Sequence, residues 1–182
     1  MNNILQENTP TIFTERLILR KFTLSDLPHY YKIMACKATN KYLPWFPPKS
    51  ESEALSLLHK NCLDSYDLPS GYRYAVCLKE NNVPIGYCGS SGTESNDIGY
   101  GLLKDFWHKG IMTEAVTALV NKMKKAGYPY ITATHDVNNI YSGAVMRKVG
   151  MRYKYSYNEV WQPKNYLVTF RMYQLNFDGE QD

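Results

Sequence analysis

One stretch of the sequence has residue types and a spacing that suit anion binding. It reads DIGYGLLKDFWHKGIMTEA from Asp97 to Ala115, in the form of a strand, a short loop with Gly110 and an amphipathic helix. The first N–H groups of a helix have no partner within it, and the helix dipole adds positive charge at the same end. The stretch therefore predicts a phosphate or carboxylate site at the helix start. A plain strand–turn–helix, with Gly110 as the turn residue, is the alternative.

Two common phosphate-binding motifs do not match this stretch. Gly99 and Gly101 begin a G-x-G pattern, but Lys104 stands where the dinucleotide motif needs its third glycine. The pattern G-x-x-x-x-G-K-[ST] does not occur in the chain either. The predicted anion site is therefore of another kind.

Two further segments complete a set of motifs. Near the start, residues 14–20 read TERLILR, and further on residues 138–151 read NNIYSGAVMRKVGM. Together with residues 98–115 they resemble, in order and spacing, three motifs of the GNAT acetyltransferase superfamily, in its branch of RimJ/RimL-like ribosomal-protein N-terminal acetyltransferases. The resemblance spans about residues 12 to 176. It implies acetyl-CoA as the co-substrate and a primary amine as the acetyl acceptor, with no metal.

The resemblance also implies where the coenzyme binds. Acetyl-CoA is expected in a V-shaped opening between strands at 97–103 and 130–134, with the backbone of Leu102 and Leu103 pairing with its pantetheine arm. Asn139 is expected to hydrogen-bond the pantetheine or to hold the splayed strands. The pyrophosphate is expected on the backbone N–H groups of a short run: His108, Lys109, Gly110, Ile111, Met112 and Thr113. The Lys109 side chain either adds charge there or is solvated.

The chain departs from the family pattern at informative positions. Trp107 and Met112 occupy the first and last places of the usual loop Q/R-x-x-G-x-G/A. The tyrosine that protonates the leaving thiolate in many members falls at Met146, which cannot donate a proton. Ser142 matches the position that donates to the coenzyme sulfur in the RimL-like branch, and is predicted to take that role. Its alternative is a helix N-terminal residue without a catalytic task.

An amine acceptor also needs a base, because an alkyl amine is mostly protonated at neutral pH. Asp97, at the start of its strand, is the candidate, directly or through water, with a strand-capping aspartate as the alternative. Trp45, Phe46 and Tyr100 are predicted to line the acceptor cleft. An open groove there suits a protein or peptide N-terminus, the first expectation. A closed aromatic pocket suits a small cation such as a polyamine, an aminoglycoside or an amino-acid derivative. A non-catalytic acyl-CoA-binding module is a third possibility.

The pattern of elements predicts a mixed α/β fold of the α+β type. Strands are expected at 16–22, 72–78, 84–89, 97–103, 130–134, 151–160 and 166–176, with helices after the capping boxes at Thr23 and Ser50 and at 111–125 and 141–149. The order β-α-α-β-β-β-α-β-α-β-β is not doubly wound. It predicts a twisted, mostly antiparallel central sheet flanked by helices, and the resemblance implies that two central strands splay apart to form the coenzyme cleft.

Composition sets further expectations. The length of 182 residues and the absence of a long linker predict a single domain over 1–182. The net charge of +4, without runs of like charge, argues against nucleic-acid binding. We expect no signal peptide, no membrane span, four reduced cysteines and no zinc site. These features predict a cytoplasmic monomer or homodimer.

Overall fold

The computed structural model describes residues 7–69 and 71–177. Its strands and helices follow the predicted order, with three short 3-10 helices (η) between them. The helices are α1 (Leu27–Ala35), α2 (Glu51–Asn61), α3 (Ile111–Lys125), α4 (Ile140–Lys148), η1 (Leu24–Asp26), η2 (Leu63–Ser65) and η3 (Lys104–Phe106). The strands are β1 (Ile12–Phe13), β2 (Leu17–Lys21), β3 (Tyr72–Leu78), β4 (Pro84–Ser90), β5 (Ile98–Leu102), β6 (Tyr130–Asp136), β7 (Arg152–Trp161) and β8 (Tyr166–Asn176).

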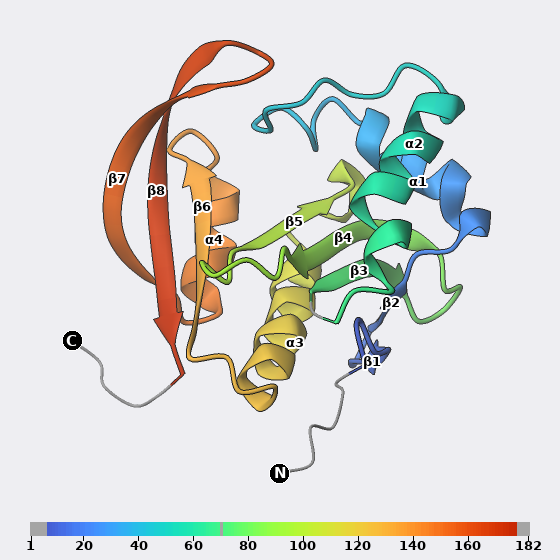
Figure 1. Cartoon of the computed structure of the whole chain (residues 1–182), viewed down its shortest axis with the longest axis horizontal. Helices are drawn as coiled ribbons and strands as arrows, with labels where there is room; N and C mark the ends of the chain where they lie inside the picture. Colours follow the sequence, from blue (N-terminus) through green and yellow to red (C-terminus); the bar gives the residue numbers. More distant parts are fainter. Residues whose placement is uncertain (1–6, 70, 178–182) are drawn as a thin grey trace.

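Within the described ranges the strands form two antiparallel sheets. The first has the order β1-β2-β3-β4-β5 and the second the order β6-β8-β7. The two sheets meet at one isolated parallel bridge between Asp97 and Thr132. Figure 1 shows the second sheet standing beside the first, with β5 and β6 as the neighbouring edges. The predicted central sheet is therefore divided at the place where the resemblance implies that two strands splay apart.

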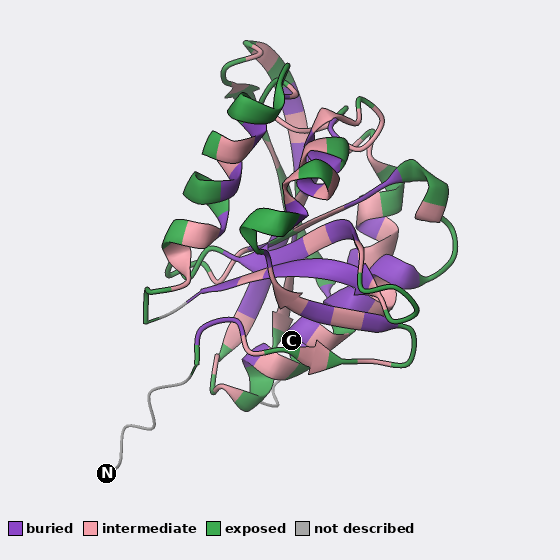
Figure 2. Cartoon of the chain, turned by 90° about the vertical axis from the view of Figure 1, so that its right-hand side faces the viewer, coloured by how far each residue is buried: buried purple, intermediate pink, exposed green. Residues whose placement is uncertain are grey.

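Helices cover both faces of the first sheet. On one face α3 buries Val116, Leu119, Val120 and Met123, the stripe that its periodicity predicts. On the other face α1 and α2 form a second cluster with the sheet, which includes Tyr30. Figure 2 shows the buried residues concentrated in the strands between these layers. Helices packed on both faces of the sheet hold its edge strand, β5, in place.

The predicted local signals place the element ends. The Ser50 hydroxyl accepts the Glu53 N–H at 3.2 Å and begins α2, and the Thr23 N–H donates to the Asp26 carboxylate at 2.8 Å before α1. Asn82 has φ 55°, as its predicted turn between β3 and β4 requires. The two predicted helix caps and the predicted turn are confirmed.

The differences from the prediction are small. The sequence did not predict β1, which is only two residues long and pairs with β2. Strand β6 continues to Asp136 rather than ending near 134, because it pairs with β8 over seven residues. The ends of the predicted 1–182 domain lie outside the described residues. None of the helices described is long and apolar enough to cross a membrane, and the described residues hold no cluster of three potential metal-ligating side chains.

Candidate functional site

A cavity opens where β5 and β6 part. The Thr132 N–H donates to the Asn96 carbonyl at 3.3 Å beside the Asp97–Thr132 bridge, and beyond that point the two strands diverge. The cavity has a volume of about 700 Å³ and lies between β5, the loop before α3, and the start of α4. It brings together Tyr100, from the predicted acceptor cleft, with most of the residues predicted for the coenzyme site: Leu102, His108, Gly110, Ile111, Met112, Thr113, Asn139 and Ser142.

The loop before α3 presents a row of backbone donors. His108 and Gly110 have φ of 60° and 74°, and Gly110 is the N-cap of α3. The N–H groups of 108–113 donate to no backbone acceptor among the residues that the structure describes. The Met112 side chain, which stands where the family pattern has a small residue, is buried in the core. The geometry thus provides a cradle for an anion at a positive helix end.

The positive side chains at the cavity differ from those predicted. Lys109 does not line it, because its ammonium donates to the Asp105 carbonyl at 2.9 Å. Lys41, Lys104 and Lys148 do line it. Of these, only Lys148 carried a sequence signal, as the lysine of the third motif. The prediction that Lys109 supplies charge to a phosphate is therefore not supported by its position.

The structure limits the backbone pairing that was expected between Leu102 and Leu103 and the pantetheine arm. The Leu103 N–H donates to the Ile85 carbonyl at 3.0 Å, and its carbonyl accepts from Phe106. The Leu102 carbonyl accepts from the Trp107 indole at 2.8 Å and from the Thr39 hydroxyl at 3.0 Å. Leu103 is thus corrected to a structural residue, and the Leu102 N–H remains as the backbone donor for a ligand in this stretch.

Tyr100 and Ser142 face each other across the cleft. The Ser142 hydroxyl donates to the Tyr100 hydroxyl at 3.1 Å, and the Tyr100 hydroxyl donates to the Ser142 carbonyl at 2.8 Å. Burial raises the pKa of Tyr100, against the lowering effect of the Ser142 hydrogen bond, so the phenol stays protonated. The sequence predicted Tyr100 in the acceptor cleft. The structure instead pairs it with the residue predicted to meet the coenzyme sulfur, a contact that no spacing in the sequence indicated.

Asn139 positions this pair. It is the N-cap of α4, and its side-chain oxygen accepts the Ser142 N–H at 3.3 Å. Its role here is to begin the helix that carries Ser142.

Asp97 lies on the other side of β5. Side chains alternate along a strand, so Asp97 and Gly99 face away from the side on which Tyr100 lies. Burial raises the pKa of Asp97 to about 6, opposed by a hydrogen bond from Thr132. Asp97 does not line the cavity.

Trp45 and Phe46 are not brought to the cavity. The Trp45 indole donates to the Asn40 side chain at 3.3 Å, and Phe46 is 61% exposed. The neighbouring loop residues Thr39, Lys41 and Tyr42 line the cavity instead. The structure thus places Tyr100 against α4 and leaves Trp45 and Phe46 outside this cavity, so their place in an acceptor cleft stays a prediction.

A buried histidine, His135, packs against α4. His135 is 4% exposed, its Nδ1–H donates to the Asp136 carbonyl at 2.7 Å, and its Nε2 has no partner among the described residues. Burial lowers the pKa of His135, and the nearby Arg171 and Arg147 act in the same direction, so the ring is neutral. A Cβ on Gly143 would lie 2.6 Å from that Nε2. The helix therefore rests on the imidazole ring at the residue next to Ser142.

Comparison with known proteins gives matches among acetyltransferases. A family model described as an acetyltransferase (GNAT) domain matches residues 16–152. The chain is 28% identical to the uncharacterized N-acetyltransferase YnaD of Bacillus subtilis over 145 residues, which cover 78% of this chain and 82% of that protein. It is 29% identical to the uncharacterized N-acetyltransferase p20 of Bacillus licheniformis over 116 residues, 61% of this chain and only 64% of that protein.

Solved structures share the fold. An acetyltransferase (GNAT family) from Bacillus anthracis has a TM-score of 0.80 at 22% identity, covering 93% of this chain and 99% of that one. RimL, the ribosomal L7/L12 alpha-N-protein acetyltransferase, in complex with coenzyme A has a TM-score of 0.77 at 21% identity, covering 94% of this chain and 100% of that one. The Microcin C7 self immunity acetyltransferase MccE, in complex with acetyl-CoA and AMP, has 0.79 at 18%, covering 93% and 98%.

The first prediction concerns the loop cradle. Gly110→Val should weaken acetyl-CoA binding at least tenfold, because a branched side chain opposes φ 74° and obstructs close approach of a ligand. Lys109→Ala should change it by less than about threefold, the effect of an exposed charge. Isothermal calorimetry measures both affinities. If Lys109→Ala were the more damaging change, a point charge and not the backbone would hold the anion.

The second prediction concerns the support of α4. In a helix, Gly→Ala usually stabilises by about 1 kcal/mol. Gly143→Ala should instead lower the free energy of unfolding by about 1–3 kcal/mol, because the added methyl group collides with His135. In a His135→Ala background the same change should become stabilising. Urea unfolding measures each step, and Gly99→Ala, with no heavy atom within 4 Å of its Cβ, is the control. A more stable Gly143→Ala protein would show that the ring does not support the helix.

Proposed function

The chain belongs to the GNAT acetyltransferase family, and from this premise we propose that it transfers an acetyl group from acetyl-CoA to the α-amine of a protein or peptide N-terminus. The observation that carries the proposal is the cavity between β5, the loop before α3 and the start of α4, near the place where β5 and β6 part. It is lined on one side by the free N–H groups before α3 and on the other by the Tyr100–Ser142 hydroxyl pair. Both RimL and MccE, which share the fold, were solved with coenzyme A or acetyl-CoA.

The hydroxyl pair supports thiolate release. When the amine nitrogen attacks the thioester carbonyl and the C–S bond breaks, negative charge moves onto the sulfur. Ser142 and Tyr100 carry two O–H groups at the cleft wall, and either can turn to donate to that sulfur. A thiol has an ordinary pKa of about 8.5, so the thiolate needs only modest stabilisation. This pair replaces the tyrosine that the family pattern has at Met146, whose side chain is 1% exposed and packed in the core.

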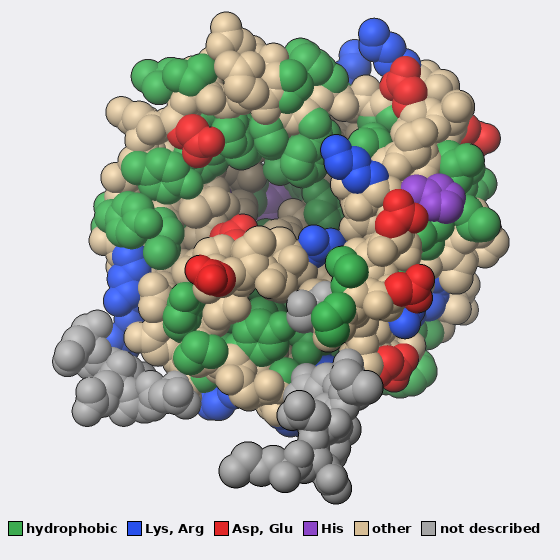
Figure 3. All heavy atoms as spheres, in the orientation of Figure 1, with side chains coloured by type: hydrophobic (Ala, Val, Ile, Leu, Met, Phe, Trp, Pro, Cys, Tyr) green, Lys and Arg blue, Asp and Glu red, His purple; other side chains and the backbone are tan. Residues whose placement is uncertain are grey.

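The opposite side of β5 supports amine access. Gly99 has no heavy atom within 4 Å of its Cβ position, and it stands two residues from the Asp97 carboxyl. Figure 3 shows the surface hollowed near the centre of the face in view, with hydrophobic side chains above the hollow and acidic and basic side chains below and beside it. An open approach suits the end of a peptide chain better than a closed pocket would.

The pKa of Asp97 favours an α-amine over a lysine side chain. An α-amine has an ordinary pKa of about 8 and a lysine of about 10.4. A carboxylate with a pKa of about 6 lies about two units below the first and more than four below the second. At 1.36 kcal/mol per unit, deprotonating lysine costs about 3 kcal/mol more. The likeness to RimL, an alpha-N-protein acetyltransferase, points the same way.

The third prediction tests the acceptor. Release of free thiol from acetyl-CoA should be seen with peptides that have a free N-terminus. It should be absent with the same peptides when the N-terminus is formylated and an internal lysine remains. A polyamine and an aminoglycoside complete the panel. Faster turnover with either small amine would make the small-molecule alternative the correct one. Tight acetyl-CoA binding without turnover on any amine would indicate a binding module.

The fourth prediction uses the titration of Asp97. In the wild type, kcat/KM should rise as pH passes about 6, because the carboxyl must be ionised to accept a proton. Asp97→Asn should lose that limb. As an independent check, burial makes the folded pKa higher than the unfolded one, so the wild type loses stability as pH rises from about 4 to about 6. Asp97→Asn should thus melt higher than wild type at pH 8 but not at pH 4. An unchanged rate profile would assign proton removal to water.

A further inference from the structure

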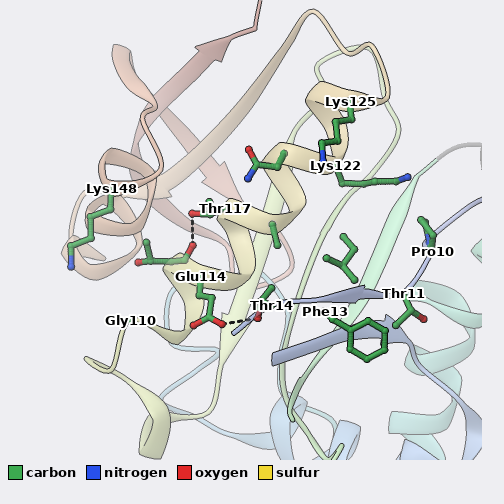
Figure 4. A pocket seen from close by; sticks show the side chains of 14 residues that line it. Pro10, Thr11, Phe13, Thr14, Gly110, Glu114, Thr117, Lys122, Lys125 and Lys148 are labelled. Carbon is green, nitrogen blue, oxygen red and sulfur yellow. Dashed lines mark hydrogen bonds between the residues drawn. The ribbon is translucent and has the colours of Figure 1, made fainter. Parts of the chain in front are cut away.

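The first and second sequence motifs touch each other through residues that the proposed chemistry does not use. Arg16 belongs to the TERLILR segment at the start of β2, and Glu114 lies in the first turn of α3. The Arg16 Nε donates to Glu114 Oε2 at 2.7 Å, and the Arg16 backbone N–H donates to Glu114 Oε1 at 2.9 Å. The Thr14 hydroxyl donates to the same Oε1 at 2.6 Å. Figure 4 shows the Thr14–Glu114 contact beside Gly110, in the groove on the outer side of α3.

The Arg16 guanidinium also reaches the coenzyme loop. Its Nη1 donates to the Lys109 carbonyl at 2.8 Å, and its Nη2 lies 3.5 Å from the Cβ position of Gly110. Its partners Thr14 and Glu114 line the outer groove, which shares Gly110, Thr113 and Lys148 with the cleft. One side chain thus joins β2, the loop and α3.

Because the peptide bond is planar, the contact between Arg16 and the Lys109 carbonyl also sets the direction of the next N–H group. The Lys109 carbonyl and the Gly110 N–H belong to one trans peptide unit, so they point in opposite directions. Holding the carbonyl toward Arg16 on the outer side turns the Gly110 N–H toward the cleft. Gly110, at φ 74°, has many conformations available, so the direction of this donor has to be fixed from outside.

Glu114 is suited to hold Arg16 in place. Its side chain is 17% exposed, and although burial opposes ionisation, hydrogen bonds from Thr14 and Arg16 keep the pKa of Glu114 below its ordinary value. An isolated surface ion pair contributes little. Here the carboxylate accepts three donors from one segment, and the planar guanidinium serves two acceptors at once, which a lysine cannot reproduce.

We infer that Arg16 is a positioning residue for coenzyme binding: fixed by Glu114 and Thr14, it orients the Lys109–Gly110 peptide so that the Gly110 N–H faces the pyrophosphate. The inference rests on the proposed function in that acetyl-CoA is the co-substrate, but it does not depend on the acceptor.

The chain offers a matched control in the same TERLILR segment. Arg20 forms an ion pair with Asp26 at 2.7 Å, the same length as the Arg16–Glu114 pair, and it is less exposed. Its other contacts go to Asn82 and Lys21, not to the coenzyme loop. Arg20→Ala should therefore lower the melting temperature without changing coenzyme affinity.

The experiment measures affinity for coenzyme A and for pantetheine, which lacks the pyrophosphate, by calorimetry well below each melting temperature. Arg16→Ala should weaken coenzyme A binding at least tenfold, the effect of losing a hydrogen bond from a charged group. Its affinity for pantetheine should stay within about twofold. Arg16→Lys, which keeps the charge, should weaken coenzyme A binding at least threefold. Arg20→Ala should bind both ligands like the wild type.

Each other outcome would overturn the inference. Equal weakening of both ligands in the Arg16 variants would mean a general structural role, and unchanged coenzyme A affinity would mean no role. An equal loss in Arg20→Ala would show that any β2 ion pair has the same effect. If Arg16→Ala does not fold, Arg16→Lys decides alone. Wild-type protein that bound no coenzyme A would overturn the proposed function as well, whereas a failed acceptor panel with intact binding would leave the inference standing.

Discussion

The parting of β5 and β6 after the Asp97–Thr132 bridge is the constraint on which the site depends. Two strands that separate inside a protein leave edges of N–H and C=O groups that must find other partners. Part of this need is met internally, since Trp107 and Thr39 both donate to the Leu102 carbonyl. The rest is available to a ligand, and the loop at 108–113 adds its own free donors at the mouth of the same gap. The cleft thus results from the geometry of the two sheets, and the side chains around it determine what it can bind.

The gap also separates two kinds of chemistry. On the side of α4 lie hydroxyl donors that remain protonated, because burial raises the pKa of Tyr100. On the other side lies a carboxyl that burial brings to a pKa of about 6, within reach of ionisation near neutral pH. The same cause, loss of water, keeps the Tyr100 hydroxyl protonated as a hydrogen-bond donor and raises the pKa of the Asp97 carboxyl toward neutral pH. Alternation of side chains along the chain keeps the two groups apart, since Asp97 directly precedes β5 and stands three residues before Tyr100.

The sequence predicts much of the fold because its signals are local. The α3 stripe, the Ser50 and Thr23 caps and the turn at Asn82 each depend on a few adjacent residues. It does not predict contacts that tertiary packing creates. Trp45 and Phe46 sit in an irregular loop, where no periodicity indicates direction. Tyr100 pairs with Ser142, and Arg16 with Glu114, across 42 and 98 positions of the chain. Leu103 lost its predicted role because the nearby strand and turn already use both its backbone groups.

The most direct test of the central claim, that the β5–β6 cleft holds the coenzyme, is a titration of ¹⁵N-labelled protein with acetyl-CoA followed by amide NMR. The account predicts the largest shifts at the amides of 108–113, with further shifts at Leu102 and Ser142. The amides near Lys122 and Lys125, in the C-terminal part of α3, should change little, although these two residues line the larger groove of about 1000 Å³. Shifts concentrated along that outer groove, with 108–113 unaffected, would contradict the account.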